Sequence, residues 1–328
     1  QLTFVLPSKR AGTFLKQAIS KHVKKTIFSP NIVSIEEFVE TLSDFQYATN
    51  AELLFEFYDV YIKNTPKEHI EPFDKFYQWA QILLQDFNEL DRYLIESNKV
   101  FDYLTAIKEI ENQHWSLDEQ PTQYIKNYLQ FWNRLKSYYL HFQKQLTKKK
   151  KGYQGLIYKQ AVNNIEQFTA SHQDDIYVFV GFNALNKAEE IIIKELLRQD
   201  LALIYWDIDS AFIENKIHDA GLFTRDHKTH WPYFNTNNFN WISNHYSEEK
   251  DIEIIGAPKN ISQIKYVGEL LEQINNKKDN LQNTAVILGD ETLLIPLLNS
   301  IPKSIKTTNI TMGLPLKAIP LASLFENL

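Results

Sequence analysis

The feature that most constrains the fold is a change in the spacing of apolar residues along the chain. From about residue 35 to residue 146 they recur at steps of three and four residues, which is the period of an amphipathic helix. One such series consists of Phe76, Trp79, Ala80, Leu83, Leu84 and Phe87. On both sides of this block, short apolar runs alternate with helical patterns, and strands that alternate with helices build parallel sheets. The sequence therefore predicts an α/β fold into which a large all-helical segment is inserted.

Local signals place several of the elements. Apolar runs predict strands in residues 2–6, in "DDIYVFVGF" and in "LALIYWDID". Ser34 precedes Glu37 by three residues, and Asn186 precedes Glu189 by the same interval. This is the spacing of a capping box, so helices are expected to begin directly after Ser34 and Asn186.

A second α/β unit is expected after an irregular connection that is rich in Asn, His, Asp and aromatic residues. Its strands should lie in "DIEIIGA" and "NTAVILGD", and a helical pattern follows each of them. The expected domains are residues 1–35 with 152–245 for the first α/β domain, 36–151 for the inserted helical subdomain, and 250–328 for part of a second α/β domain.

Composition excludes several classes of protein. The chain has 328 residues, enough for two or three domains, and 44% of them are hydrophobic, as in globular proteins. It contains no cysteine, which excludes disulfides, thiolate metal sites and cysteine nucleophiles within these residues. No run approaches the roughly 18 apolar residues of a membrane span. We therefore expect no membrane partner, and the lack of cysteine is compatible with a cytoplasmic location.

The net charge is −6, but the positive charges are unevenly distributed. Residues 1–35 contain six Lys or Arg and no acidic residue. Ser8, Lys9 and Arg10 stand where the first helix should start, and the helix dipole disfavours cations at that end. They therefore suggest an external anion such as a phosphate, with a solvated first turn as the alternative. A second cluster, within "TKKKKG", could also contact phosphates or form a solvated loop; it consists of Lys148, Lys149, Lys150 and Lys151.

Familiar nucleotide-binding and hydrolase motifs are missing from the sequence. None of the nine glycines is followed by Lys, so no Gly-Lys-Ser/Thr phosphate-binding loop exists in these residues, and neither does a Gly-x-Gly-x-x-Gly fingerprint. Gly-x-Ser-x-Gly and His-Glu-x-x-His are absent as well. The nearest nuclease-like triplets, "DHK" at Asp226 and "EEK" at Glu248, lie in the irregular connection without strand context. No catalytic residue is therefore assigned.

Two polar pairs could hold a metal. Asp207 and Asp209 follow an expected strand, where ligands of open α/β sheets bind, and such a pair can coordinate a divalent cation. This arrangement would suit a metal-dependent, nucleotide-sugar glycosyltransferase-like enzyme, whereas a polar loop is the simpler interpretation. His227 and His230 are a weaker candidate, since no third and fourth ligand is evident.

Aromatic residues are dense in the helical block, and single-stranded nucleic acids stack their bases on exposed rings. At helical spacing such residues more often form the core. The residues concerned are Trp79, Trp115, Trp132, Tyr138 and Tyr139, and we expect them to be buried.

Five segments, taken in order, carry a resemblance to a known family. They are "FVLPSKRAGTFLK", "LLQDFNELDRYLI", "VFVGFNALNKAEEIIIKEL", "AVILGDETLLIPLLNSIP" and "NITMGLPLKAIPLASLFENL". Together they resemble the N-terminal part of the AddB-like, RecB-family proteins of Bacteroidetes. Those proteins carry an inactivated superfamily 1, UvrD-like helicase region followed by a PD-(D/E)XK nuclease domain. No single motif is diagnostic, but the resemblance spans nearly the whole chain.

The resemblance implies a fold and a set of partners. The α/β parts would be a RecA-like (P-loop NTPase-type) domain that carries the helical insertion and the start of a second RecA-like domain. Ser8, Lys9 and Arg10 would contact the phosphates of single-stranded DNA. The protein would process DNA double-strand breaks together with an AddA-type helicase-nuclease subunit. A purely protein-binding scaffold is a further alternative.

One departure from an active motor is important. The acidic residue of the family's magnesium-binding strand, which would precede Gly181 and Phe182, is Val180 here, so neither the metal nor the attacking water of ATP hydrolysis would be held. The resemblance therefore implies an ATPase-inactive region without a cofactor of its own. The chain begins at Gln1 and ends inside a helical pattern, so we expect a fragment of a longer protein, whose Mg²⁺-dependent nuclease residues would lie beyond Leu328.

Overall fold

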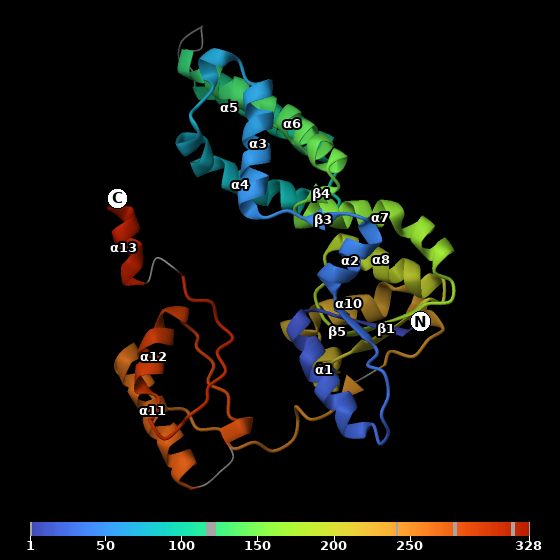
Figure 1. The fold of residues 1–328 in the computed structure, drawn as a ribbon, viewed down its shortest axis with the longest axis vertical. Coiled ribbons are helices and arrows are strands. Elements are labelled where there is room, and N and C mark those ends of the chain that lie inside the picture. Colours follow the sequence, from blue (N-terminus) through green and yellow to red (C-terminus); the bar gives the residue numbers. More distant parts are fainter. Residues whose placement is uncertain (1, 116–122, 241, 278–280, 316–318, 328) are drawn as a thin grey trace. The chain divides into compact units, whose positions relative to one another are not determined.

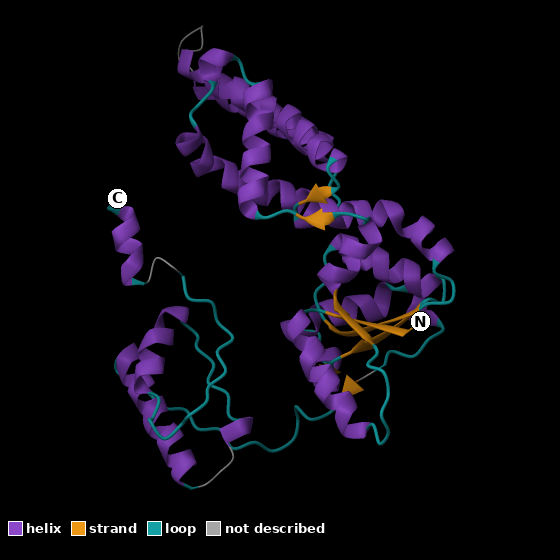
Figure 2. Cartoon of the chain, in the orientation of Figure 1, coloured by secondary structure: helices purple, strands orange, loops and turns teal. Residues whose placement is uncertain are grey.

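The computed structural model describes residues 2–115, 123–240, 242–277, 281–315 and 319–327. The chain divides into two compact units, Gln1–Glu248 and Glu249–Leu328, and each is described here by itself. The first unit contains a sheet and a separate layer of long helices, whereas the described part of the second unit consists of helices and irregular segments (Figures 1 and 2).

The first unit is built around a four-stranded sheet in which every neighbouring pair of strands is parallel. Its strand order is β2-β1-β5-β6, so the two central strands come from distant parts of the chain. The bounds are β1 (Leu2–Leu6), β2 (Asn31–Ser34), β5 (Ile176–Phe182) and β6 (Ala202–Trp206). The prediction of an α/β fold with a parallel sheet is confirmed for this unit.

Three helices share one hydrophobic core with this sheet: α2 (Ile35–Ser43), α7 (Gln154–Ser171) and α8 (Lys187–Arg198). Both predicted capping boxes are present, with Ser34 before α2 and Asn186 before α8. Val39 on α2, Phe179 on β5 and Ile192 on α8 are fully buried in this core. Helix α1 (Lys9–His22) packs separately, against β1 and β2.

The helical layer has a core of its own and consists of α3 (Asn50–Asn64), α4 (Phe73–Arg92), α5 (Ser97–Trp115) and α6 (Gln123–Lys148) (Figure 1). Aromatic rings dominate this core. The ring of Phe57 lies within 5.3 Å of Phe76 and 5.2 Å of Phe142, centroid to centroid. The chain enters and leaves the layer through two short parallel strands, β3 (Gln46–Tyr47) and β4 (Lys151–Gly152).

The position of α2 differs from our expectation. We placed the start of the helical subdomain at residue 36, but Phe38, Val39 and Leu42 of α2 are buried against the sheet and α7. The helical layer therefore begins with α3. Helical periodicity could not reveal this, because it shows which face of a helix is buried and not which core covers that face.

A buried carboxylate links the two layers. Asp91 of α4 is fully buried and accepts hydrogen bonds from the hydroxyls of Tyr139 and Tyr153, both at 2.5 Å, and from Gln143 at 2.6 Å. Lys159 of α7 completes the group, with 2.9 Å between its Nζ and Asp91 Oδ1. Because an unpaired buried charge is costly, this network holds α4, α6 and α7 in one arrangement.

The connection after β6 contains several short elements. They are β7 (Ile208–Asp209), α9 (Ser210–Glu214), α10 (Leu222–His230) and β8 (Ile242–Ser243), and β7 pairs with β8 in parallel. Trp231 follows α10 and is 1% exposed; it packs edge-on against Trp206 of β6. The connection is therefore anchored to the main core.

The second unit differs from our prediction. Its helices are α11 (Asn260–Asn276), α12 (Leu294–Ser300) and α13 (Pro320–Glu326). The strands expected in "DIEIIGA" and "NTAVILGD" do not form within the described residues of this unit. Ile254 is 93% exposed and Ile287 is 91% exposed. Apolar runs predict a strand only where a neighbouring strand supplies hydrogen bonds, and no described segment does so here.

Among the described helices, none combines the length and the apolar content that crossing a bilayer requires.

Candidate nucleic-acid interface

Helix α1 starts directly after the first strand. Ser8 is its N-cap, with extended backbone angles, and its hydroxyl accepts a hydrogen bond from the backbone N–H of Ala11 at 3.3 Å. Gly12 lies against the sheet, and a Cβ there would approach Ile32 Cγ2 to 3.1 Å, so a small residue allows α1 to lie close to β2. The inner stripe of the helix is Ala11, Gly12, Leu15, Ile19 and Val23.

The opposite side of α1 faces solvent and carries both charge and an aromatic ring. Arg10, Phe14, Gln17 and Lys21 are exposed, and their spacing of three and four residues places them on one face. Phe14 is 58% exposed. A further phenylalanine, Phe28, lies in the segment between α1 and β2 and is 99% exposed.

The side chain of Lys9 has an acidic partner. Its Nζ lies 2.8 Å from Oε1 of Glu37, whose other oxygen accepts hydrogen bonds from the backbone N–H and hydroxyl of Ser34. The bond to Lys9, then that to Ser34, lowers the pKa of Glu37, and Glu37 in turn raises the pKa of Lys9. The Lys9 side chain is 73% exposed, and such ion pairs are weak, so a phosphate can compete for this ammonium.

The remaining cations of this segment differ from Lys9. In the described part of the chain, no ion pair involves Arg10, Lys16, Lys21, Lys24 or Lys25. All five are exposed. We call these five residues and Lys9 the α1 basic surface. Five of the six cations therefore have no ion pair among the described residues, and this surface presents a net positive charge to the solvent.

The second lysine cluster is arranged differently. Lys149 pairs with Glu56, Lys150 with Asp44 at 2.5 Å, and Lys151 with Glu52 at 2.9 Å. All three acids lie in or beside α2 and α3, so the fold brings an acidic partner to each of these three lysines. Lys148, the last residue of α6, is exposed, and no ion pair among the described residues involves it.

The carboxyl end of β5 is the place where the family resemblance expects a metal-binding acid. Val180 occupies it, followed by Gly181 with φ of 76° and an irregular pairing with β6 between residues 180 and 182. Gly181 is the residue type that this left-handed backbone favours. Neither residue has an oxygen-bearing side chain, so this strand end supplies no carboxylate ligand.

Asp209, one member of the Asp207 and Asp209 pair, is engaged by hydrogen bonds within the protein. Asp209 is 8% exposed, and its Oδ1 accepts from the backbone N–H of Ala211, while Oδ2 accepts from two further backbone N–H groups and a hydroxyl. These hydrogen bonds, from Ala211 first, lower its pKa. A metal ion at this carboxylate would compete with these donors. Asp209 therefore stabilises the loop that joins β7 to β8.

The side chains of His227 and His230 have different environments. His227 is 6% exposed, its ring packs against Trp206, and burial lowers its pKa. His230 is exposed and pairs with Asp226 at 2.8 Å. Across the described residues, no group of three or more His, Cys, Asp or Glu side chains is placed to hold a metal ion.

The aromatic residues of the helical block are mostly core residues, as expected. Tyr138 and Tyr139 are at most 1% exposed, and Trp79 and Trp132 pack at the margin of the same core. The Nε1 of Trp79 donates to Glu71 Oε2 at 2.9 Å. The side chain of Trp115 lies outside the described residues. Several aromatic rings are exposed instead, and two of them, Phe14 and Phe28, lie among the cations of the α1 basic surface. Sequence reasoning missed both, although an apolar residue on a polar helix face was an available signal for Phe14.

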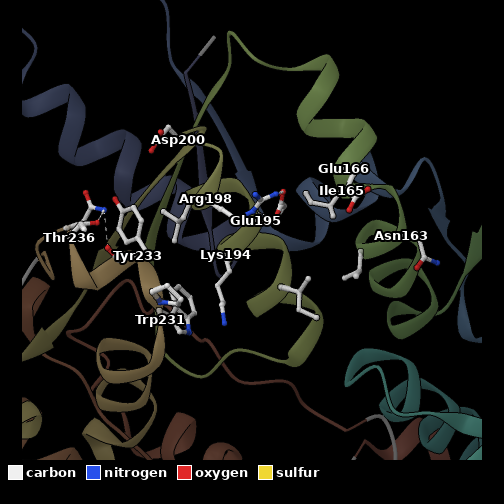
Figure 3. A pocket seen from close by; sticks show the side chains of 15 residues that line it. Asn163, Ile165, Glu166, Lys194, Glu195, Arg198, Asp200, Trp231, Tyr233 and Thr236 are labelled. Atoms are coloured by element: carbon white, nitrogen blue, oxygen red, sulfur yellow. Dashed lines mark hydrogen bonds and ion pairs between the residues drawn. The ribbon is translucent and has the colours of Figure 1, made fainter.

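A pocket of about 840 Å³ lies between α7, α8 and residues 231–237 (Figure 3). Both cations that line it are paired with acids of α8: Lys194 with Glu190 at 3.3 Å, and Arg198 with Glu195 at 2.5 Å. Two further carboxylates, Glu166 and Asp200, also line the pocket, so its acidic side chains outnumber its cations, unlike the α1 basic surface.

We compared the sequence with models of known protein families and with curated proteins. No family model matches the chain. No curated protein matches it significantly. The functional proposal below therefore depends on the geometry of the site and on the resemblance described above.

Proposed function

We propose that this chain is the ATPase-inactive, helicase-like region of a protein that processes DNA double-strand ends, and that it binds DNA through the α1 basic surface. The observation that carries the proposal is a set of five exposed cations that have no ion pair among the described residues, three on helix α1 and two, Lys24 and Lys25, in the segment that follows it. Phosphate contacts supply most of the sequence-independent affinity of proteins for DNA.

The architecture supports a relationship to helicase motors. We interpret the parallel sheet with its inserted helical layer as a RecA-like domain. The assignment of Glu249–Leu328 to the start of a second one depends on the resemblance alone, because the described residues of that unit form no strand. An active motor needs a Gly-Lys-Ser/Thr loop and an acidic residue for its metal. The sequence lacks the first, and Val180 replaces the second. We therefore propose that ATP hydrolysis belongs to a partner, an AddA-type helicase-nuclease subunit, and that Mg²⁺ serves a nuclease domain elsewhere in the protein.

The alternatives are weaker. A nucleotide-sugar transferase would use Asp207 and Asp209 as metal ligands, but four hydrogen bonds from within the protein already engage the nearly buried carboxylate of Asp209. A protein that serves only as a scaffold is compatible with the ion pairs of Lys149, Lys150 and Lys151. It does not explain why the cations of the α1 basic surface are exposed and mostly without acidic partners.

The test measures binding of fluorescent DNA, single-stranded and blunt duplex, by anisotropy between 50 and 300 mM salt. We expect affinity to fall steeply with salt and Lys9→Ala/Arg10→Ala to weaken binding by about tenfold. The matched control is Lys149→Ala/Lys150→Ala, which removes two cations that are paired. A Lys9→Ala/Arg10→Ala variant that binds both DNAs as tightly as the parent would remove the assignment.

A further inference from the structure

We infer that Phe14 and Phe28 each stack on an unpaired base, and that these two rings make the α1 basic surface a binding site for single strands in preference to duplexes. This inference rests on the proposed function, because it assumes that the surface binds nucleic acid. It adds that aromatic rings, and not only cations, contact the ligand, and that unpaired bases are what they contact.

The exposure of the two rings is the first support. Phe28 is 99% exposed and Phe14 is 58% exposed, so neither contributes most of its ring to the core. An exposed phenylalanine ring forgoes the stabilisation that burial of its apolar surface would give. By comparison, Phe55, which is 63% exposed on the helical layer, already stacks on Phe73 with ring centroids 5.0 Å apart.

The position of Phe14 is the second support. It lies on the outer face of α1, one helical turn after Arg10 and two turns before Lys21. The inner face of the helix already has its own apolar stripe, so Phe14 is not needed for packing against the sheet. Phe28 likewise follows two cations, Lys24 and Lys25, within the segment that joins α1 to β2.

The combination identifies the ligand. Single-stranded nucleic acids bind where cations follow the backbone and aromatic rings stack on successive bases. In a duplex the faces of the bases are covered by their neighbours, so only the cations could act. A lipid surface would also accept cations and apolar side chains, but it would not distinguish an aromatic ring from leucine.

The test compares Phe14→Leu and Phe28→Leu with Phe14→Trp and Phe28→Trp. The probes are a thymidine oligonucleotide, a blunt duplex of equal length and phosphatidylserine vesicles. Each leucine variant should bind the single strand about tenfold more weakly, with an unchanged salt slope because the phosphate contacts remain. Each tryptophan variant should bind at least as tightly as the parent. Duplex binding should be the same in all variants, and Phe55→Leu is the matched control.

The outcomes separate this inference from the proposed function. If the parent binds neither DNA, both are wrong. If the parent binds DNA and the leucine variants bind the single strand as tightly as the parent, the proposed function stands and the stacking role of Phe14 and Phe28 is wrong. Vesicle binding that exceeds binding of the single strand, and that leucine preserves, would assign the surface to lipid and overturn the inference.

Discussion

Two lysine-rich segments of this chain look alike in sequence and differ in the fold. The α1 basic surface has one cation with an acidic partner, Lys9, whereas three of the four lysines in Lys148–Lys151 are paired with acids. The acids of the second cluster come from positions about 100 residues earlier, at Asp44, Glu52 and Glu56. A run of like charges therefore indicates a binding surface only when the fold brings no opposite charges to it.

The largest effect on stability should come from replacing Asp91. Its ion pair with Lys159 differs from those of the lysine clusters because the carboxylate is buried. Asp91→Ala leaves Lys159 and two tyrosine hydroxyls without their acceptor. We expect the free energy of unfolding to fall by about 3–5 kcal/mol, measured by urea denaturation. Asp91→Asn keeps one acceptor oxygen and should cost less. A loss below about 1 kcal/mol for alanine would contradict the role given to this network.

The next effect tests the comparison directly. Replacing Lys16, Lys21, Lys24 and Lys25 by alanine should weaken DNA binding by about 100-fold and reduce the slope of log affinity against log salt by about three. The same replacement at Lys148, Lys149, Lys150 and Lys151 should weaken binding less than threefold. Equal losses from the two sets would show that the ion pairs of the second cluster open for DNA, and the contrast between the clusters would be lost.

A smaller effect concerns pH. The backbone N–H of Thr49, and then Lys151, lower the pKa of Glu52 to about 2. A carboxyl whose pKa is lower in the folded state stabilises the fold above its unfolded pKa, about 4.3, and this contribution is lost as the pH falls toward 2. Glu52→Gln should therefore reduce the dependence of the urea midpoint on pH between 4.5 and 2.5. An identical pH profile for the parent and Glu52→Gln would exclude this contribution.

The smallest effect is a difference in thermal stability between two variants of the second lysine cluster. Lys150→Ala should lower the thermal midpoint slightly, because it removes the ion pair with Asp44, whereas Lys148→Ala should leave it unchanged. Differential scanning calorimetry at low salt measures both, and the difference should shrink at 1 M salt. A destabilised Lys148→Ala protein would show that this lysine has a structural role as well.

The alternation of strands and helices predicted the parallel sheet, because strands joined by helical crossovers run parallel. Sequence periodicity predicted the inserted helices and the caps at Ser34 and Asn186, because each of these depends on residues close together in the chain. It could not predict which core receives α2, or that Glu56 neutralises Lys149, because these depend on contacts between distant segments. The strands expected near Ile254 and Ile287 failed for a similar reason. A strand requires a neighbour, and apolar composition alone does not show whether one is present.

The candidate site was predicted in part. Ser8, Lys9 and Arg10 were singled out because cations at a helix start are unfavourable, and the structure places them together at the beginning of α1. The exposure of Phe28 could not be foreseen. Only the fold shows that the segment between α1 and β2 leaves this ring entirely in solvent.

The two short strands β3 and β4 have a consequence for how the molecule can change. Since Gln46 pairs with Lys151 and Tyr47 with Gly152, the chain enters and leaves the helical layer at adjacent positions, and the layer is an insertion whose two ends meet. The strand order of the sheet does not depend on the length of this insertion. Insertions or deletions in the tips of its helices can therefore accumulate over evolution while the sheet and α1 keep their geometry.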